Sequence, residues 1–91
     1  MIEYKEWKIG LRFQDIETGE MGEWIQFPAR KIPVDGSLAH AVRDIANGMN
    51  WPAALMQCEI VLIDSTSPRG VERVFEVERE VVNTFMIQEK D

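Results

Sequence analysis

The sequence is poor in the residues that cross-link a chain, bind metals or anchor it in a membrane. Cys58 is its only cysteine and His40 its only histidine, so no intrachain disulfide can form and a zinc site lacks paired ligands. No wholly apolar run exceeds that from Ile60 to Ile63, which is far too short to span a bilayer. The N-terminus carries charges where a signal peptide needs an apolar stretch. We therefore expect a soluble cytoplasmic protein that holds no metal and no cofactor.

Basic residues are also scarce. Ten lysines and arginines stand against sixteen acidic residues, which gives a net charge of −6 and a pI near 4.7. This balance argues against direct binding to nucleic acid and against docking on an anionic membrane, because both need a basic surface. It is compatible with a basic protein partner, or simply with solubility. The sequence also contains no glycine-rich phosphate loop and no GxSxG or HExxH motif.

The length of 91 residues and the 45% content of hydrophobic residues indicate one small globular domain, residues 1–91. The most clearly helical stretch runs from Ser37 to Asn47. Its apolar residues recur at the spacing that lays one stripe along a helix: Leu38, Ala41, Val42, Ile45 and Ala46. Ser37 or Asp35 can cap its first turn, and Gly48 is expected to end it in the left-handed conformation. Three turns of helix cannot bury this stripe alone, so the helix must lie on a sheet.

Alternation of apolar and polar residues predicts a strand over residues 7–14, with every second side chain on a buried face: Trp7, Ile9, Leu11 and Phe13. Ile2 and Tyr4 are out of phase with it, so the first five residues either fray or cross a bulge. A second strand is expected over Met21–Phe27. The next stretch, residues 28–36, contains two prolines and reads as an extended connector or an edge segment.

The alternation of apolar and polar side chains along the two strands predicts how they pair, because opposed residues must point to the same face. A three-residue loop, Glu17-Thr18-Gly19, keeps apolar side chains on one face and puts Gly19 at the position that needs a left-handed conformation. The same register sets Arg12 opposite Trp24 on the outer face, close enough for a cation–π contact. The loop gives the pairs Ile16–Glu20, Leu11–Ile25 and Ile9–Phe27.

The C-terminal half predicts two or three more strands. Residues 58–64 are apolar on both faces and read as a central strand, and residues 65–70 form a turn cluster. Residues 71–88 favour either a long strand bent near Arg79-Glu80 or two strands, with a C-terminal helix as the alternative. The expected fold is α+β: the order β-β-α-β-β, with one helix packed on one face of an antiparallel sheet.

His40, Asp44 and Cys58 are the residue types of a nucleophile, a base and an orienting carboxylate. His40 and Asp44 lie one helical turn apart on the expected polar face, where a solvated local pair is the ordinary outcome. Cys58 enters a central strand and is most simply a buried apolar residue. We therefore expect no catalytic site.

Four glutamates recur at even positions near the C-terminus: Glu72, Glu76, Glu78 and Glu80. In a strand, residues two apart lie about 6.8 Å apart on one face. This is about twice the axial charge spacing of one DNA strand, so the row could occupy a basic groove that handles nucleic acid. The simpler interpretation is a solvated face whose charges prevent aggregation. Val74 interrupts the row, and Arg73 and Arg79 sit between its members.

Two tryptophans are candidate contact residues: Trp24 on the outward face of the second strand, with Arg12 beside it, and Trp51 next to a proline. Tryptophan is enriched at interface hot spots, although in a protein this small it also commonly belongs to the core. Trp7 is assigned to the core. One helix cannot cover two apolar sheet faces, so an uncovered face would indicate a homodimer or a partner.

The leading hypothesis is therefore a non-enzymatic module that binds another protein, such as a basic protein that handles nucleic acid. In size and acidity the chain is similar to small inhibitor proteins of phages and mobile elements, such as anti-restriction and anti-CRISPR proteins. The interaction residues proposed are Glu72, Glu76, Glu78, Glu80, Trp24, Trp51 and Arg12. The alternatives are a small structural subunit that self-associates through sheet edges, and an enzyme or ligand binder that uses His40, Asp44 and Cys58.

Overall fold

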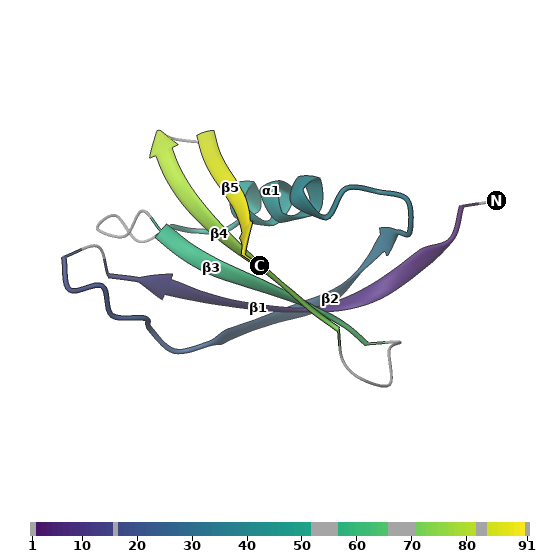
Figure 1. Ribbon diagram of the computed structural model, residues 1–91, viewed down its shortest axis with the longest axis horizontal. Coiled ribbons are helices and arrows are strands. Elements are labelled where there is room, and N and C mark those ends of the chain that lie inside the picture. Colours follow the sequence, from purple (N-terminus) through teal and green to yellow (C-terminus); the bar gives the residue numbers. More distant parts are fainter. Residues whose placement is uncertain (1, 16, 52–56, 66–70, 82–83, 91) are drawn as a thin grey trace.

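The computed structural model describes residues 2–15, 17–51, 57–65, 71–81 and 84–90. Five strands form one antiparallel sheet in the order β2-β1-β3-β4-β5, and the helix α1 lies on one face of it (Figure 1). This confirms the α+β fold expected from the sequence. In chain order the elements are β1 Tyr4–Gln14, β2 Ile25–Pro33, α1 Leu38–Gly48, β3 Gln57–Asp64, β4 Glu72–Val81 and β5 Thr84–Lys90.

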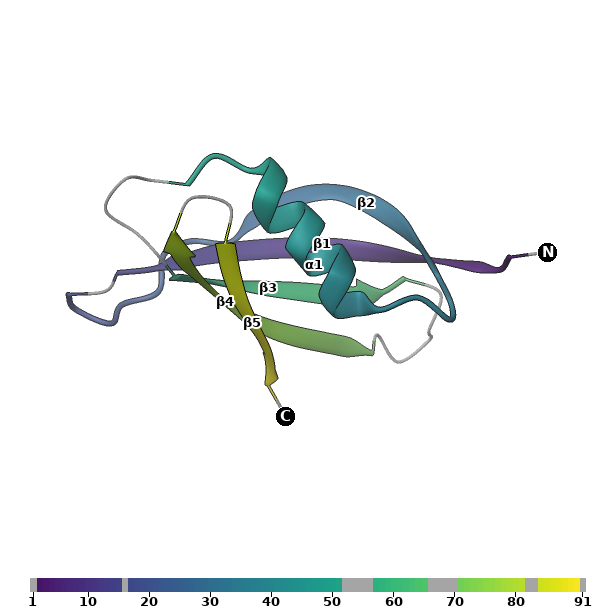
Figure 2. The ribbon, with the colours of Figure 1, turned by 90° about the horizontal axis from the view of Figure 1, so that it is seen from above.

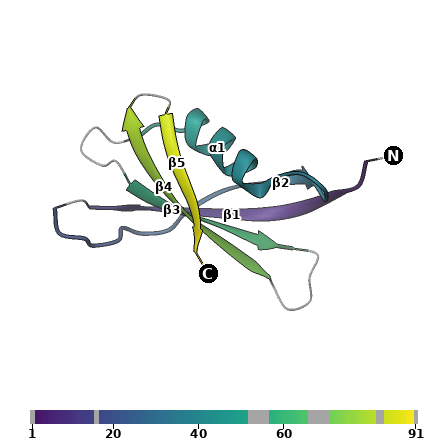
Figure 3. The ribbon, with the colours of Figure 1, turned by 45° about the horizontal axis from the view of Figure 1, so that its top comes forward.

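The core lies between α1 and the concave side of the sheet. Seen from above, α1 lies over the sheet (Figure 2), and the tilted view shows β4 and β5 rising beside it (Figure 3). The helix contributes three small buried side chains, Ala41, Val42 and Ala46. Small residues let the helix backbone approach the sheet closely. The buried side chains that meet them from the strands are Trp7, Ile9, Leu11, Ile32, Cys58, Ile60, Leu62, Phe75, Val77 and Phe85.

The pairing of the first two strands confirms the predicted register in its central part. Leu11 pairs with Ile25 and Ile9 with Phe27, while Gly19 has a left-handed φ of 77°. The predicted pair Ile16–Glu20 involves a residue outside the described ones. At this turn the Asp15 N–H donates to the Glu20 carbonyl at 2.8 Å and Gln14 bridges Met21, so Asp15 lies opposite Glu20 and the predicted loop of three residues is wrong.

The predicted bounds of the second strand, Met21–Phe27, are wrong at both ends. Met21 makes only an isolated bridge to Gln14, one residue out of step with the ladder that begins at Ile25. At the other end β2 continues through Pro28 as the edge strand of the sheet. The register shifts between Phe27 and Arg30, and this bulge accommodates Pro28, which has no N–H to donate to the ladder.

The helix begins as predicted and ends differently. Ser37 is the N-cap, and its Oγ accepts a hydrogen bond from the His40 N–H at 3.2 Å. The expected left-handed end at Gly48 is wrong. Gly48 is the last helical residue, Met49 follows in an extended conformation, and Gly19 is the only glycine with positive φ among the described residues.

The C-terminal stretch forms two strands, as one of the two strand interpretations expected, and the alternative of a C-terminal helix is wrong. β4 and β5 pair as an antiparallel hairpin, with a register shift between Arg79 and Val81 close to the expected bend. Phe75 and Val77 of β4 and Phe85 of β5 are buried beneath the helix. The strand conformation is favoured because it buries these odd-numbered residues while the even-numbered glutamates remain exposed.

Gly19 and Gly48, which both have open space around them, test whether the first has a left-handed backbone and the second a helical one. We expect Gly19→Ala to destabilise the fold by about 1 kcal/mol, because alanine tolerates a left-handed φ poorly. Gly48→Ala should instead stabilise it by up to about 1 kcal/mol, because alanine favours the helical conformation. Urea denaturation of both variants measures these changes, and equal effects at the two positions would contradict the assignment of φ.

Candidate protein-binding face

The sheet face opposite α1, called here the uncovered face, is covered by no other helix or strand that the structure describes (Figures 1 and 3). The register and the alternation of side chains place its members across four strands. Its apolar side chains are Val61, Ile63, Val74 and Met86. Its charged side chains are Lys8, Arg12, Glu59, Glu72, Glu76, Glu78 and Lys90.

Glu59, in the middle of β3, is the centre of an ionic cluster on this face. Its carboxylate accepts from Arg12 of β1 at 2.9 Å and from Lys90 of β5 at 2.9 Å, and Lys90 also lies 3.1 Å from the Glu76 carboxylate. Only 6% of Glu59 is exposed, because the two long cationic side chains fold over it. The cluster thus links four neighbouring strands across the uncovered face.

The electrostatic environment keeps Glu59 ionised. Burial by itself would raise the pKa of Glu59, but hydrogen bonds from Lys90 and Arg12 and their positive charges outweigh it and hold the pKa below its ordinary value. Sequence reasoning did not select Glu59 or Lys90. The signal available was a lone glutamate at the start of a run otherwise apolar, since a buried carboxylate needs partners.

The structure separates the glutamates of β4 into paired and unpaired ones. Glu76 is bound by Lys90, whereas Glu72, Glu78 and Glu80 are exposed and form no ion pair among the described residues. The basic residues between them point to the helix side of the sheet. On that side Arg73 binds Glu89 and Arg79 lies 5.9 Å from the ring centre of Trp51, so neither neutralises the row.

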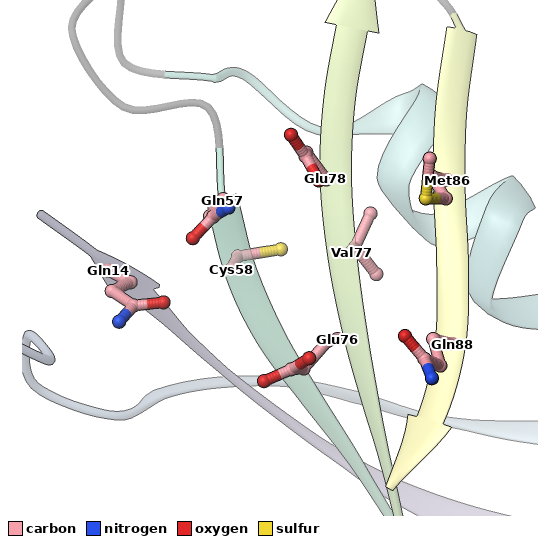
Figure 4. Close-up of a pocket in the computed structure, with 8 residues that line it drawn as sticks. All are labelled: Gln14, Gln57, Cys58, Glu76, Val77, Glu78, Met86 and Gln88. Carbon is pink, nitrogen blue, oxygen red and sulfur yellow. The ribbon is translucent and has the colours of Figure 1, made fainter. Parts of the chain in front are cut away.

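One end of the uncovered face is polar. Figure 4 shows Gln57, Glu78 and Met86 on three adjacent strands, where register places them side by side. They border a small hollow of about 80 Å³ together with Gln14 and Gln88. This volume holds only a few water molecules, so the end offers hydrogen-bonding groups and one exposed methionine rather than a ligand pocket.

The other end carries Trp24 and a larger hollow. The predicted cation–π contact is present, with the Arg12 guanidinium carbon 4.5 Å from the centre of the Trp24 ring. The ring also lies against Gly10, where an added Cβ would meet it at 3.4 Å. Beside it is an open hollow of about 460 Å³ that is bordered by Val61 and Ile63 of β3. Trp24 itself remains 51% exposed.

Trp51 lies on the opposite side of the sheet from Trp24. Its Nε1 donates to the Ala46 carbonyl at 2.9 Å, and its ring stacks on Phe85 at 5.6 Å between centroids. It also meets Phe13 edge-on at 5.9 Å. Trp51 therefore seals the end of the core below the helix, and the two candidate tryptophans do not belong to one surface.

The structure does not bring His40, Asp44 and Cys58 together. His40 and Asp44 are exposed on α1, where Asp44 lies 3.8 Å from Arg30 of β2. Cys58 is buried in β3, and burial raises the pKa of its thiol to about 12. A neutral buried thiol is a poor nucleophile.

Within the described parts of the chain, no group of three or more histidine, cysteine or acidic residues is arranged to hold a metal ion. None of the helices seen there has the length and apolar character needed to cross a membrane.

Comparisons with known proteins give no further indication of function. No protein-family model, no curated protein and no solved structure matches this chain.

Glu59→Gln tests the cluster. We expect it to lower the unfolding free energy at pH 7 by about 1–3 kcal/mol, since two charged hydrogen bonds lose their anionic acceptor. The pKa of Glu59 is lower in the folded protein than the value of about 4.3 expected in the unfolded chain. The ionised carboxylate therefore stabilises the fold fully when the pH is above that unfolded-state pKa, and this stabilisation is lost as the pH falls through the folded-state pKa.

The denaturation curves of wild type and variant should therefore begin to converge as the pH falls below about 4.3 and should meet below the folded-state pKa of Glu59. Glu76→Gln, at the exposed end of the same network, is the matched control and should cost less than about 1 kcal/mol. A pH-independent difference between wild type and Glu59→Gln would contradict the ionic role of Glu59.

The buried thiol gives a second test. At pH 8 the native protein should react with a disulfide reagent at least about a hundredfold more slowly than the urea-unfolded chain, because almost no thiolate forms at Cys58. The absorbance of the released thiol measures the rate. Rapid labelling of the native protein would show that Cys58 is accessible and ionisable.

Proposed function

We propose that this chain is a non-enzymatic protein-binding module whose uncovered face presents an acidic surface to a basic, nucleic-acid-handling partner. The observation that carries the proposal is the set of exposed glutamates on β4 that form no ion pair within the described parts of the chain, on a sheet face that no described element covers. Such a partner holds its nucleic acid with lysine and arginine, which these carboxylates complement. The module would meet this partner in the cytoplasm and act as an inhibitor.

The arrangement of charges supports a protein partner over solvation alone. Arg73 and Arg79 lie on the helix side of the sheet, although they alternate with the glutamates in sequence. The fold therefore sorts the charges of β4 by face, and no cation of the described segments forms an ion pair with Glu72 or Glu78. The pairing of Glu76 with Lys90 interrupts the row, so the acidic surface consists of two separated parts.

The alternative of assembly through sheet edges has less support at β2. This edge strand carries Pro28 and Pro33, and a bulge interrupts its ladder with β1. Prolines and bulges are features that prevent an edge from pairing with another strand.

A double charge reversal tests the proposal. Glu78→Lys with Glu80→Lys should abolish capture of the partner from a lysate of the source cell, whereas the matched reversal Glu17→Lys with Glu20→Lys should leave it intact. Both variants change the net charge equally, and the control residues lie on the hairpin between β1 and β2, outside the row of glutamates on β4. Captured protein should elute as salt rises, since exposed charge pairs are screened.

Capture that survives the reversal at Glu78 and Glu80, or that is lost equally in the control, would refute the proposal. Mass spectrometry of the eluted protein identifies the partner, and a circular dichroism spectrum of each variant confirms that it folds.

A further inference from the structure

We propose that the hollow beside Trp24 is the anchoring site for one apolar side chain of an extended, basic segment of the partner. This rests on the proposed function and adds the chemistry of the segment recognised. The observation that supports this proposal is that an apolar hollow and an acidic residue lie side by side: the rim of the hollow includes Glu72, the first glutamate of β4.

The hollow is built from rigid parts of the sheet. Its base is formed by Gly10 of β1 and Val61 of β3, which are directly paired, and the absent side chain at Gly10 lets the Trp24 ring lie close to the backbone of β1. Ile63 and the indole of Trp24 form its walls. The Trp24 ring is held between the backbone at Gly10 and the guanidinium of Arg12, so it is positioned before any partner arrives.

The shape of the hollow favours a side chain of a larger partner over a free small molecule. Its volume of about 460 Å³ falls in the range of ligand pockets, but it lies open on the surface of a sheet. A pocket for a free ligand encloses most of the ligand and directs several polar groups at it. Here the polar groups Lys8, Gln26 and Glu72 lie around an apolar centre, which is the composition of a protein–protein anchor.

The charges of the uncovered face select a basic partner and disfavour a second copy of this chain. Arg12 and Lys90 are already bound to Glu59, which leaves Lys8 and the two glutamates Glu72 and Glu78 to face whatever docks, so the balance of these charges is acidic. Two copies meeting through this face would bring their glutamates together. A lysine two residues from the anchoring side chain, on the same side of an extended segment, would instead meet Glu72, and one about six residues further on would meet Glu78, about 20 Å along the strand.

The test uses three synthetic peptides and the intact protein. The first peptide carries a leucine, a lysine two residues further on and another lysine about six residues beyond it, separated by polar residues. The second replaces leucine with serine, and the third replaces both lysines with glutamate. Affinity is measured by isothermal titration calorimetry at low salt for wild type, Trp24→Ala and the control Met86→Ala, another exposed apolar residue of the same face.

We expect wild type to bind the leucine peptide at least about tenfold more tightly than the serine peptide, because leucine is removed from water in the hollow. Trp24→Ala should abolish this preference, while Met86→Ala should keep it. Equal binding of the two lysine peptides would overturn the anchor and leave the acidic surface standing. Binding of the glutamate peptide as tightly as the lysine peptides would count against the acidic surface itself, and binding of none would overturn the anchor.

Discussion

A single short helix can cover only one face of a five-stranded sheet, and the rest of this structure follows from that constraint. The helix is placed where small residues, Ala41 and Ala46, let it sit closely in the concave side formed as β4 and β5 rise beside it. All the large aromatic side chains of the core meet it from that side. The opposite face has to satisfy its side chains without a second layer.

The uncovered face does so by covering itself with long charged side chains. Glu59 would be costly to bury alone in the central strand. The side chains of Arg12 and Lys90 reach it from β1 and β5, and in doing so they shield the sheet between them. This arrangement uses two cations of the face, Arg12 and Lys90, in its interior and leaves Glu72 and Glu78 at the periphery. The exposed acidity of the face is thus a consequence of how the face is stabilised.

The two ends of the uncovered face differ in their chemistry. One end is polar, with a hollow of about 80 Å³ beside Glu78 and Met86, while the other has Trp24 stacked beside Arg12 next to an apolar hollow of about 460 Å³. A rigid aromatic side chain surrounded by charged residues is the usual composition of an energetic centre in a protein interface. Trp51 has the same chemistry, but it is used to close the core against Phe85.

The sequence by itself determined β1, α1 and β3, since alternation, helical periodicity and an uninterrupted apolar run are local properties of the chain, but it misplaced β2 and left residues 71–88 open between strands and a helix. It also determined the pairing of Leu11 with Ile25, because this register keeps the alternating apolar side chains of the two strands on one face. Only the tertiary structure decided three features that depend on residues distant in sequence. They are the partners of Glu59, the face to which Arg73 and Arg79 turn, and the side of the sheet on which each tryptophan lies. Periodicity gives the face of a residue within its own strand, but only the order of strands decides what lies opposite it.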